Sequence, residues 1–149
     1  DKYLFFNVDG SIYTSKLADI KEVVTDLMLE EIPMRNNFAV GMSSLRGEII
    51  SILSLGKLLA SLSKTTMSTV DLTLDEEPGV NLKQMVTLIV EHNNLKYGLT
   101  VNSIKQVDAL EADRLNESSE VSWVKGHYRI DTRIATVLSL KSLLERECP

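Results

Sequence analysis

Residues 41–59, GMSSLRGEIISILSLGKLL, align without a gap with residues 126–144, GHYRIDTRIATVLSLKSLL. Each segment opens with a glycine, continues through a short β-branched apolar run, and ends in leucines spaced three or four residues apart. The identical pairs are Gly41 and Gly126, Ile49 and Ile134, Leu53 and Leu138, Ser54 and Ser139, Leu55 and Leu140, Leu58 and Leu143, and Leu59 and Leu144. This pattern predicts a buried strand followed by a short helix in both segments.

An earlier block of the sequence recurs at nearly the same distance. Tyr13, Ile20, Lys21 and Val23 recur 84 residues later as Tyr97, Ile104, Lys105 and Val107, whereas the longer segment recurs after 85 residues. Chance similarity between apolar strands is the alternative explanation. Two blocks in the same order and nearly the same frame favour an internal duplication.

The apolar pattern is mostly that of β-strands. Residues 4–8 lead into Asp9-Gly10, a dipeptide typical of two-residue hairpin turns. Further strand-like runs lie at 20–24, 48–55, 85–90, 95–101, 104–107 and 134–138, and the run at 48–55 is expected to be buried on both faces. Units of about 60–70 residues are marginal alone. We therefore expect a mainly β protein of two small, closed or nearly closed barrels that pack together and leave a groove at their seam.

Composition excludes several classes of protein. The 149 residues carry a formal net charge of −5 and no basic run, which argues against nucleic-acid binding. No apolar stretch approaches the ~18 residues that a membrane span requires. Cys148 is the only cysteine, so no internal disulfide can form.

A search for catalytic or metal-binding patterns finds none at the required spacing. Residues 41–47 match neither a phosphate-binding loop nor the G-x-S-x-G of serine nucleophiles. His92 and His127 have no cysteine partner at metal-ligand spacing, and the adjacent acids at 30–31 and 75–77 are typical of solvated loops. We expect no catalytic residue, metal or cofactor. An enzyme whose groups converge from distant strands is the remote alternative.

Two further features need an explanation. Arg46 stands at the entrance to the most hydrophobic strand, where it either contacts a partner or merely caps the strand end. Residues 61–84 separate the two repeats as a Ser/Thr-rich linker followed by a hairpin centred on Pro78-Gly79, which suits a type II turn.

Several motifs in this order resemble one family. One family motif, a glycine followed by Asn-Leu-Arg-Gly and a hydrophobic strand, corresponds to residues 41–55, GMSSLRGEIISILSL. A second motif, a strand followed by a short helix, corresponds to residues 126–144, GHYRIDTRIATVLSLKSLL. VTLIVEHNNLKYGLTV at residues 86–101 and the pattern of Tyr13, Ile20, Glu22 and Val23 complete the match. The chain resembles CheW, the coupling protein of bacterial chemotaxis arrays, and the related domains of chemotaxis histidine kinases, from Tyr3 to about Glu145.

The resemblance implies two pseudo-symmetric five-stranded β-barrels with short helices, one of them at the C-terminus. It implies one CheW-like domain over residues 1–149, with one subdomain of about residues 1–80, to which the helix at 140–149 could belong, and another of about 81–139. Such a domain is expected in the cytoplasm, either free or at membrane-associated receptor arrays, and is not expected to insert into the membrane.

The resemblance also implies a non-enzymatic adaptor with two partners. One is the regulatory domain of a chemotaxis histidine kinase, which is itself CheW-like, and the other is the helical cytoplasmic tip of a chemoreceptor, lying in the groove between the barrels. Other CheW-like domains are further candidate partners. Carried over by position, the partner-binding residues are Ile20, Glu22, Gly41, Arg46, Gly47, Gly98, Val101 and Gly126.

The sequence departs from the family pattern at several positions. Ser44 replaces an asparagine, Ser51 a proline, Ser54 and Ser139 an aspartate each, and Asp131-Thr132 an Asp-Gly turn. The loop after Leu110 has no proline, and the 61–84 stretch is longer than usual. A diverged coupling protein explains these departures, and so does a CheW-like interaction domain of a larger kinase or scaffold.

Overall fold

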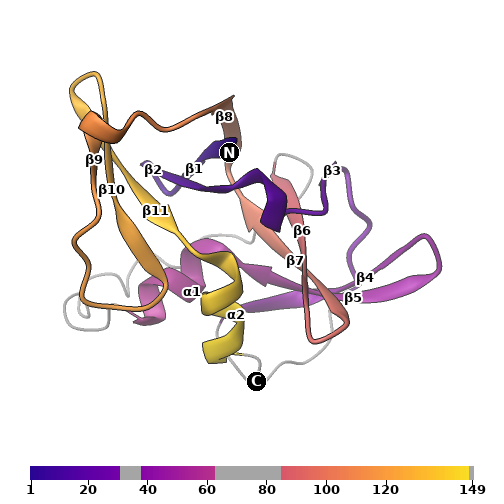
Figure 1. The fold of residues 1–149 in the computed structure, drawn as a ribbon. Helices are drawn as coiled ribbons and strands as arrows, with labels where there is room; N and C mark the ends of the chain where they lie inside the picture. Colours follow the sequence, from indigo (N-terminus) through magenta and orange to yellow (C-terminus); the bar gives the residue numbers. More distant parts are fainter. Residues whose placement is uncertain (31–37, 63–84, 148–149) are drawn as a thin grey trace, which may run out of the picture.

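The computed structural model describes residues 1–30, 38–62 and 85–147, which form two β-sheets and two short α-helices (Figure 1). The first sheet has the order β8-β1-β2-β11-β10-β9, and the second has the order β3-β6-β7-β5-β4. The first contains β1 Tyr3–Val8, β2 Ser11–Lys16, β8 Ser103–Asp108, β9 Leu115–Asn116, β10 Val124–Ile130 and β11 Arg133–Leu138. The second contains β3 Glu22–Thr25, β4 Ala39–Leu45, β5 Glu48–Ser54, β6 Val86–His92 and β7 Leu95–Val101. The helical segments are η1 Leu17–Asp19, α1 Leu55–Leu62, η4 Ala112–Arg114 and α2 Leu140–Glu147. The expected mainly β fold is confirmed.

The pairing registers of the two sheets confirm the internal duplication. In the β4–β5 hairpin Gly41 lies opposite Ile52, and in the β10–β11 hairpin Gly126 lies opposite Val137. A register shift precedes the glycine in both hairpins. The two glycines therefore occupy equivalent places, as the alignment of residues 41–59 with 126–144 predicts.

The other strand pairs repeat in the same way. Tyr13 on β2 pairs in parallel with Thr136, and Tyr97 on β7 pairs in parallel with Ser51. The antiparallel pairs repeat too. Leu4 lies opposite Val107 in the first sheet, and its repeat partner Leu88 lies opposite Val23 in the second. Val8 lies opposite Ser11, and the repeat partner of Val8, His92, lies opposite Leu95. The two sheets are thus pseudo-symmetric along most of their length.

Each sheet takes strands from both halves of the sequence. The β1–β2 hairpin lies beside β8 and β11, whereas the β6–β7 hairpin lies between β3 and β5. The division expected at about residue 80 therefore does not separate the sheets. The sheets cross this division because each contains a parallel pair, β2 with β11 or β5 with β7, and parallel partners are set by long-range packing rather than by sequence order.

The chain itself bridges the two edges of each sheet. In the first sheet the segment after edge strand β8 runs through η4 to β9 at the opposite edge. In the second, the segment after edge strand β3 reaches β4, where the Glu30 and Met42 amides each donate to the other's carbonyl at 2.8 and 3.0 Å. In both sheets the chain thus links one edge to the other, but the strand pairing of the described residues does not close either sheet into a barrel. The second has the expected five strands, and the first has the two-residue β9 as a sixth.

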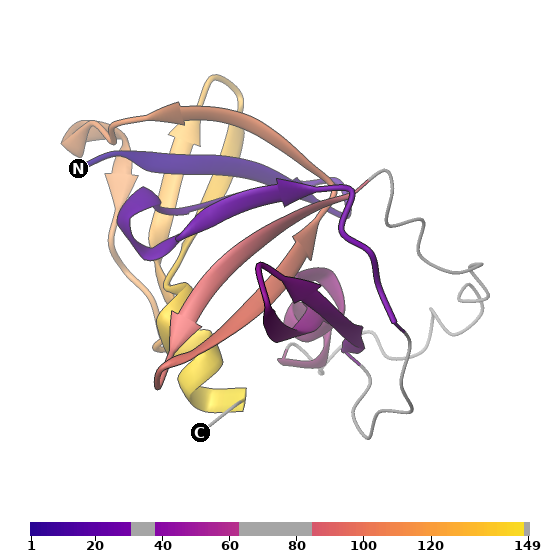
Figure 2. The same cartoon turned by 90° about the vertical axis from the view of Figure 1, so that its right-hand side faces the viewer.

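The largest apolar cluster fills the seam between the sheets and the helices. It includes Phe6, Leu53, Leu88, Leu99, Leu58, Leu140, Leu143 and Leu144, all buried. Smaller clusters around Phe5 and Ile50 fill the inner face of each sheet. Figure 2 shows α2 below the strands, and α2 contacts β6 of the second sheet. Because burying a Leu or Phe side chain contributes about 1.5–3 kcal/mol, the seam is a main source of stability.

Serines begin both helices. The Ser54 hydroxyl accepts a hydrogen bond from the Lys57 amide at 3.2 Å, and the Ser139 hydroxyl accepts one from the Ser142 amide at 3.2 Å. These serines stand where the family has aspartates, and serine and aspartate are both strong N-cap residues. Within the described ranges, no helix combines the length and the apolarity needed to cross a membrane.

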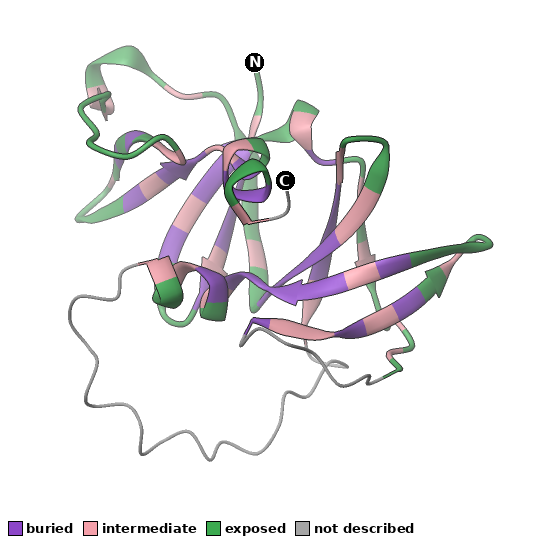
Figure 3. Ribbon diagram, turned by 90° about the horizontal axis from the view of Figure 1, so that it is seen from below, coloured by how far each residue is buried: buried purple, intermediate pink, exposed green. Residues whose placement is uncertain are grey.

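Three expectations from the sequence need correction or lie outside the described residues. Ile49 was expected in a strand buried on both faces, but 72% of its surface is exposed because it lies near the outer tip of the β4–β5 hairpin. Figure 3 shows exposed residues at hairpin tips and loops, and buried residues along the middle of the strands. Helix α1 continues to Leu62, past the expected start of the linker. The hairpin around Pro78-Gly79, the acids at 75–77 and Cys148 all lie outside the described residues.

Candidate protein-interaction site

Arg46 and Gly47 form the two-residue turn that joins β4 to β5. Both have positive φ angles, 51° for Arg46 and 85° for Gly47, as in the hairpin turns whose twist matches that of the flanking strands. The turn carries the Arg46 side chain into solvent, with 68% of its surface exposed.

The Arg46 guanidinium makes a bidentate ion pair with the Glu22 carboxylate. Its two terminal nitrogens donate to the two carboxylate oxygens at 2.7 and 2.6 Å. Glu22 begins β3, at the edge of the sheet opposite β4, so the pair joins the two edges. Hydrogen bonding from Arg46 is the main cause that lowers the pKa of Glu22, and the same hydrogen bonds raise the pKa of Arg46.

Two more ion pairs surround this one on the second sheet. The Lys96 ammonium of β7 donates to Glu48 of β5 at 2.9 Å, and this hydrogen bond, helped by the charge of Glu48, raises the pKa of Lys96. Lys21, just before β3, lies 3.3 Å from Glu91 of β6. The exposed side of the second sheet therefore carries paired charges of both signs.

Large apolar side chains are exposed at equivalent positions of the two sheets. Ile49 on β5 and its repeat partner Ile134 on β11 are 72% and 56% exposed. Val23 on β3 and its repeat partner Val107 on β8 are 42% and 48% exposed. The duplication has thus kept two pairs of apolar residues in solvent, where packing of this chain does not require them.

Ile49 and Leu95 form an exposed apolar patch on one face of the second sheet. Ser51 of β5 pairs with Tyr97 of β7, so Ile49 and Leu95, two residues earlier on each strand, lie on the same face of the sheet. Leu95 is 59% exposed. On β5 the polar Ser51 lies between Ile49 and Leu53 of the seam cluster, so a serine separates this patch from the core along that strand.

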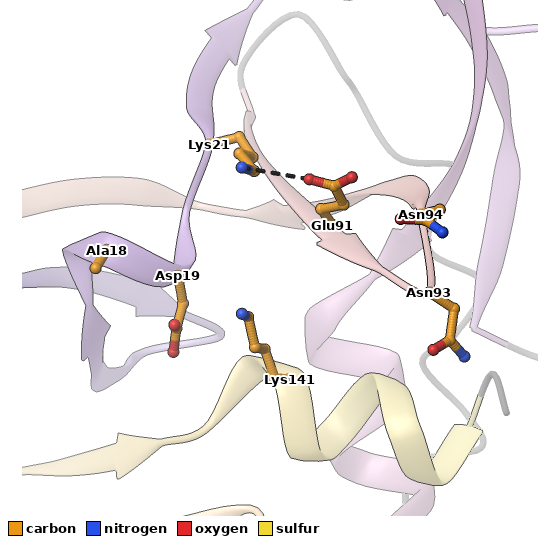
Figure 4. Close-up of a pocket in the computed structure, with 7 residues that line it drawn as sticks. All are labelled: Ala18, Asp19, Lys21, Glu91, Asn93, Asn94 and Lys141. Atoms are coloured by element: carbon orange, nitrogen blue, oxygen red, sulfur yellow. Dashed lines mark ion pairs between the residues drawn. The ribbon is translucent and has the colours of Figure 1, made fainter.

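A polar hollow of about 470 Å³ opens between η1, the β6–β7 turn and α2 (Figure 4). Its lining residues are Ala18, Asp19, Lys21, Glu91, Asn93, Asn94 and Lys141. The Lys141 side chain extends from the start of α2 into this space. The sequence singled out none of these as site residues, because they come from three separate segments and match no motif.

Comparison with known proteins agrees with the motifs. The model of the CheW-like domain family matches residues 2–148. The chain belongs to the CheW-like domain family. A crystal structure of the scaffolding protein TtCheW from Thermoanaerobacter tengcongensis is similar to this CheW-like chain, with a TM-score of 0.74 and 24% sequence identity over 97% of this chain and 92% of that one. A search of curated proteins found no match.

The CheW-like chain brings three of the eight predicted partner-binding residues together on its surface. Glu22, Arg46 and Gly47 meet at the tip of the β4–β5 hairpin. The other five, Ile20, Gly41, Gly98, Val101 and Gly126, are buried. These five positions are largely shielded from solvent, with Ile20 9% exposed.

Close packing explains the buried glycines of the CheW-like chain. A Cβ on Gly41 would lie 2.6 Å from the Glu30 carbonyl oxygen, and one on Gly126 would overlap the Asn116 carbonyl. A Cβ on Gly98 would lie 2.7 Å from side-chain carbons of both β5 and β6. The first two glycines let the bridging segments cross at equivalent places, so glycine is required there by the fold.

Within the described residues, no three His, Cys, Asp or Glu side chains gather into a group that could hold a metal ion. On the second sheet, the exposed apolar residues Ile49 and Leu95 lie on one face, and Glu22, which pairs with Arg46, lies on the other. Apolar residues that gather on a protein surface mark interaction sites.

Proposed function

We propose that this CheW-like chain is a non-catalytic adaptor that couples chemoreceptors to a histidine kinase in bacterial chemotaxis arrays. The observation that carries the proposal is the match of the CheW-like family model over residues 2–148. We place the protein in the cytoplasm, at membrane-associated receptor arrays.

An adaptor needs separate surfaces for its partners, and the two sheets offer them. The exposed apolar patch of Ile49 and Leu95 lies on one face of the second sheet and suits the apolar centre of an interface. By strand register Glu22, which pairs with Arg46, lies on the opposite face. We assign this patch to the regulatory domain of the kinase. That domain is itself CheW-like, and the equivalent Ile134 on the first sheet is available to a second CheW-like domain.

The predicted site residues divide by role. Arg46, Glu22 and Gly47 would contact the kinase domain directly. Ile20, Gly41, Gly98, Val101 and Gly126 would support the surface from beneath, since each is buried. The helical tip of a chemoreceptor would lie between the sheets in the manner of a helix in a groove.

The test is a titration of the whole chain with a purified kinase regulatory domain and with a chemoreceptor tip fragment. Both should bind, and Ile49→Asp should weaken binding of the kinase domain at least tenfold while circular dichroism stays unchanged. Lys57→Asp, at an exposed position of α1, is the matched control and should have little effect. Absence of binding to both partners at high micromolar concentration overturns the proposal.

A further inference from the structure

Three hollows meet around the short helix η1. One is the polar hollow of Figure 4, a second of about 460 Å³ is lined by Lys2, Lys16 and Leu17, and a third of about 120 Å³ by Tyr3, Lys16 and Lys125. Asp19 lines all three, so they form one continuous surface, which we call the η1 surface.

Lysines dominate the η1 surface. The five are Lys2, Lys16, Lys21, Lys125 and Lys141, against the three carboxylates of Asp1, Asp19 and Glu91. Of these lysines only Lys21 makes an ion pair within the described ranges, and all five are exposed. Within the described residues, the other four lysines therefore make no ion pair and are exposed.

This surface is opposite in sign to the molecule as a whole. The chain has ten lysines and a net charge of −5, yet half of its lysines gather here from β2, β10, α2 and the segments before β1 and β3. A hollow lined by one sign of charge concentrates ligands of the other sign and speeds their association.

We propose that the η1 surface binds an acidic, amphipathic helical segment of a partner protein. Carboxylates of the segment would pair with Lys16, Lys125 and Lys141, while its apolar side would cover Leu17, which is 36% exposed at the centre. This inference rests on the proposed function only in that its ligand is a segment of a partner protein. Beyond that function, it specifies that the segment is acidic and amphipathic.

The shape of the surface favours a peptide over an anionic membrane. The lysines line three hollows, two of about 460–470 Å³ and one of about 120 Å³ that holds Lys125, rather than a convex face, so they suit separate side chains of a bound segment.

The experiment titrates the whole chain with synthetic helical peptides that carry a leucine stripe flanked by glutamates. A second peptide has glutamine in place of every glutamate. We expect the glutamate peptide to bind at least tenfold more tightly at low salt, and to lose that advantage as ionic strength rises. The triple variant Lys16→Glu, Lys125→Glu, Lys141→Glu should bind it at least tenfold more weakly. The control Lys57→Glu, Lys105→Glu, exposed elsewhere, should differ from the unmodified chain by less than twofold.

Several results would overturn the inference. They are equal binding of both peptides, equal losses in the triple and control variants, or tighter binding to phosphatidylglycerol vesicles than to the peptide. If a receptor fragment binds the unmodified chain and the triple variant equally, this inference fails while the proposed function stands. If the glutamate peptide binds as expected but neither kinase domain nor receptor fragment does, the proposed function fails alone.

Discussion

Arg46 holds a backbone conformation that costs an arginine free energy. In the other hairpins of the described residues, the corresponding turn residues are Asp9, Asn93 and Asp131, types that tolerate a positive φ angle. Arg46 at φ 51° has a conformation that costs a residue with a Cβ about 1–2 kcal/mol, whereas exposed ion pairs such as Arg46–Glu22 contribute little to stability. Stability alone does not favour arginine here, and an unfavourable residue at an exposed turn points to a role in recognition.

That balance gives the first prediction. Arg46→Asn removes the ion pair but suits the turn, so the free energy of unfolding in urea should stay within about 1 kcal/mol of the unmodified value or rise. Binding of the kinase regulatory domain should weaken by more than about 1 kcal/mol, because arginine is often an interface anchor. Asp131→Asn, at the equivalent turn of the first sheet, is the control. A variant that unfolds readily yet binds normally per folded molecule would show that Arg46 is structural.

The Arg46–Glu22 pair also predicts a pH dependence. Because the pKa of Glu22 is lower in the folded chain than in the unfolded one, the pair contributes its full stability above the ordinary glutamate pKa of about 4.3. That contribution is lost as the pH falls through the lowered pKa of folded Glu22. The stability difference between the unmodified chain and Glu22→Gln, measured in urea, should be constant from pH 7 to 5 and shrink below about pH 4. A difference that grows toward low pH would contradict this sign.

At the scale of elements, the helix caps explain why the family's aspartates can be serines. The Ser139 hydroxyl accepts from the Ser142 amide, and its own amide donates to the Trp123 carbonyl at 2.8 Å. Ser139→Ala should therefore lower the free energy of unfolding by about 1 kcal/mol, and Ser139→Asp should preserve it, because aspartate caps equally well and suits the helix dipole. Thermal and urea unfolding of both variants measure this. Equal losses in the two would mean that the Ser139 cap is not what stabilises α2.

The sequence predicted the features that local pattern controls and missed those set by long-range packing. The Asp9-Gly10 hairpin, the strands and the equivalence of Gly41 with Gly126 follow from residues close in sequence, and each is confirmed. The parallel pairing of β2 with β11 brings together strands that no turn connects. The exposure of Ile49 depends on how far its hairpin extends beyond the seam, which an apolar run does not reveal.

The candidate site divides in the same way. Arg46 stood out because a charged residue at the start of an apolar strand is visible in the sequence, whereas its partner Glu22 is 24 residues away and on another strand. The lysines of the η1 surface come from five segments, so only the folded chain shows that they gather.

For the whole molecule, the exchange of hairpins makes each half of the sequence dependent on the other. The β1–β2 hairpin of the first half lies between β8 and β11, and the β6–β7 hairpin of the second half lies between β3 and β5. Each half therefore supplies central strands of the sheet that the other half completes. The seam cluster then joins both sheets to both helices. Local unfolding of one sheet would expose the core of the other.

This interdependence predicts that the chain unfolds as one cooperative unit and that neither half folds alone. Cutting the chain within residues 63–84 leaves β3 without the two strands that separate it from β5, and likewise leaves β8 without the strands between it and β11. A short strand or hairpin without such neighbours is marginal in water. Each fragment alone should show no cooperative urea transition by circular dichroism. An equimolar mixture should recover the β signal and a single transition, because all strand pairs can re-form between the fragments. A fragment that unfolds cooperatively by itself would mean that the sheets are separable, and that the pseudo-symmetry reflects two independent domains instead of one interlocked fold.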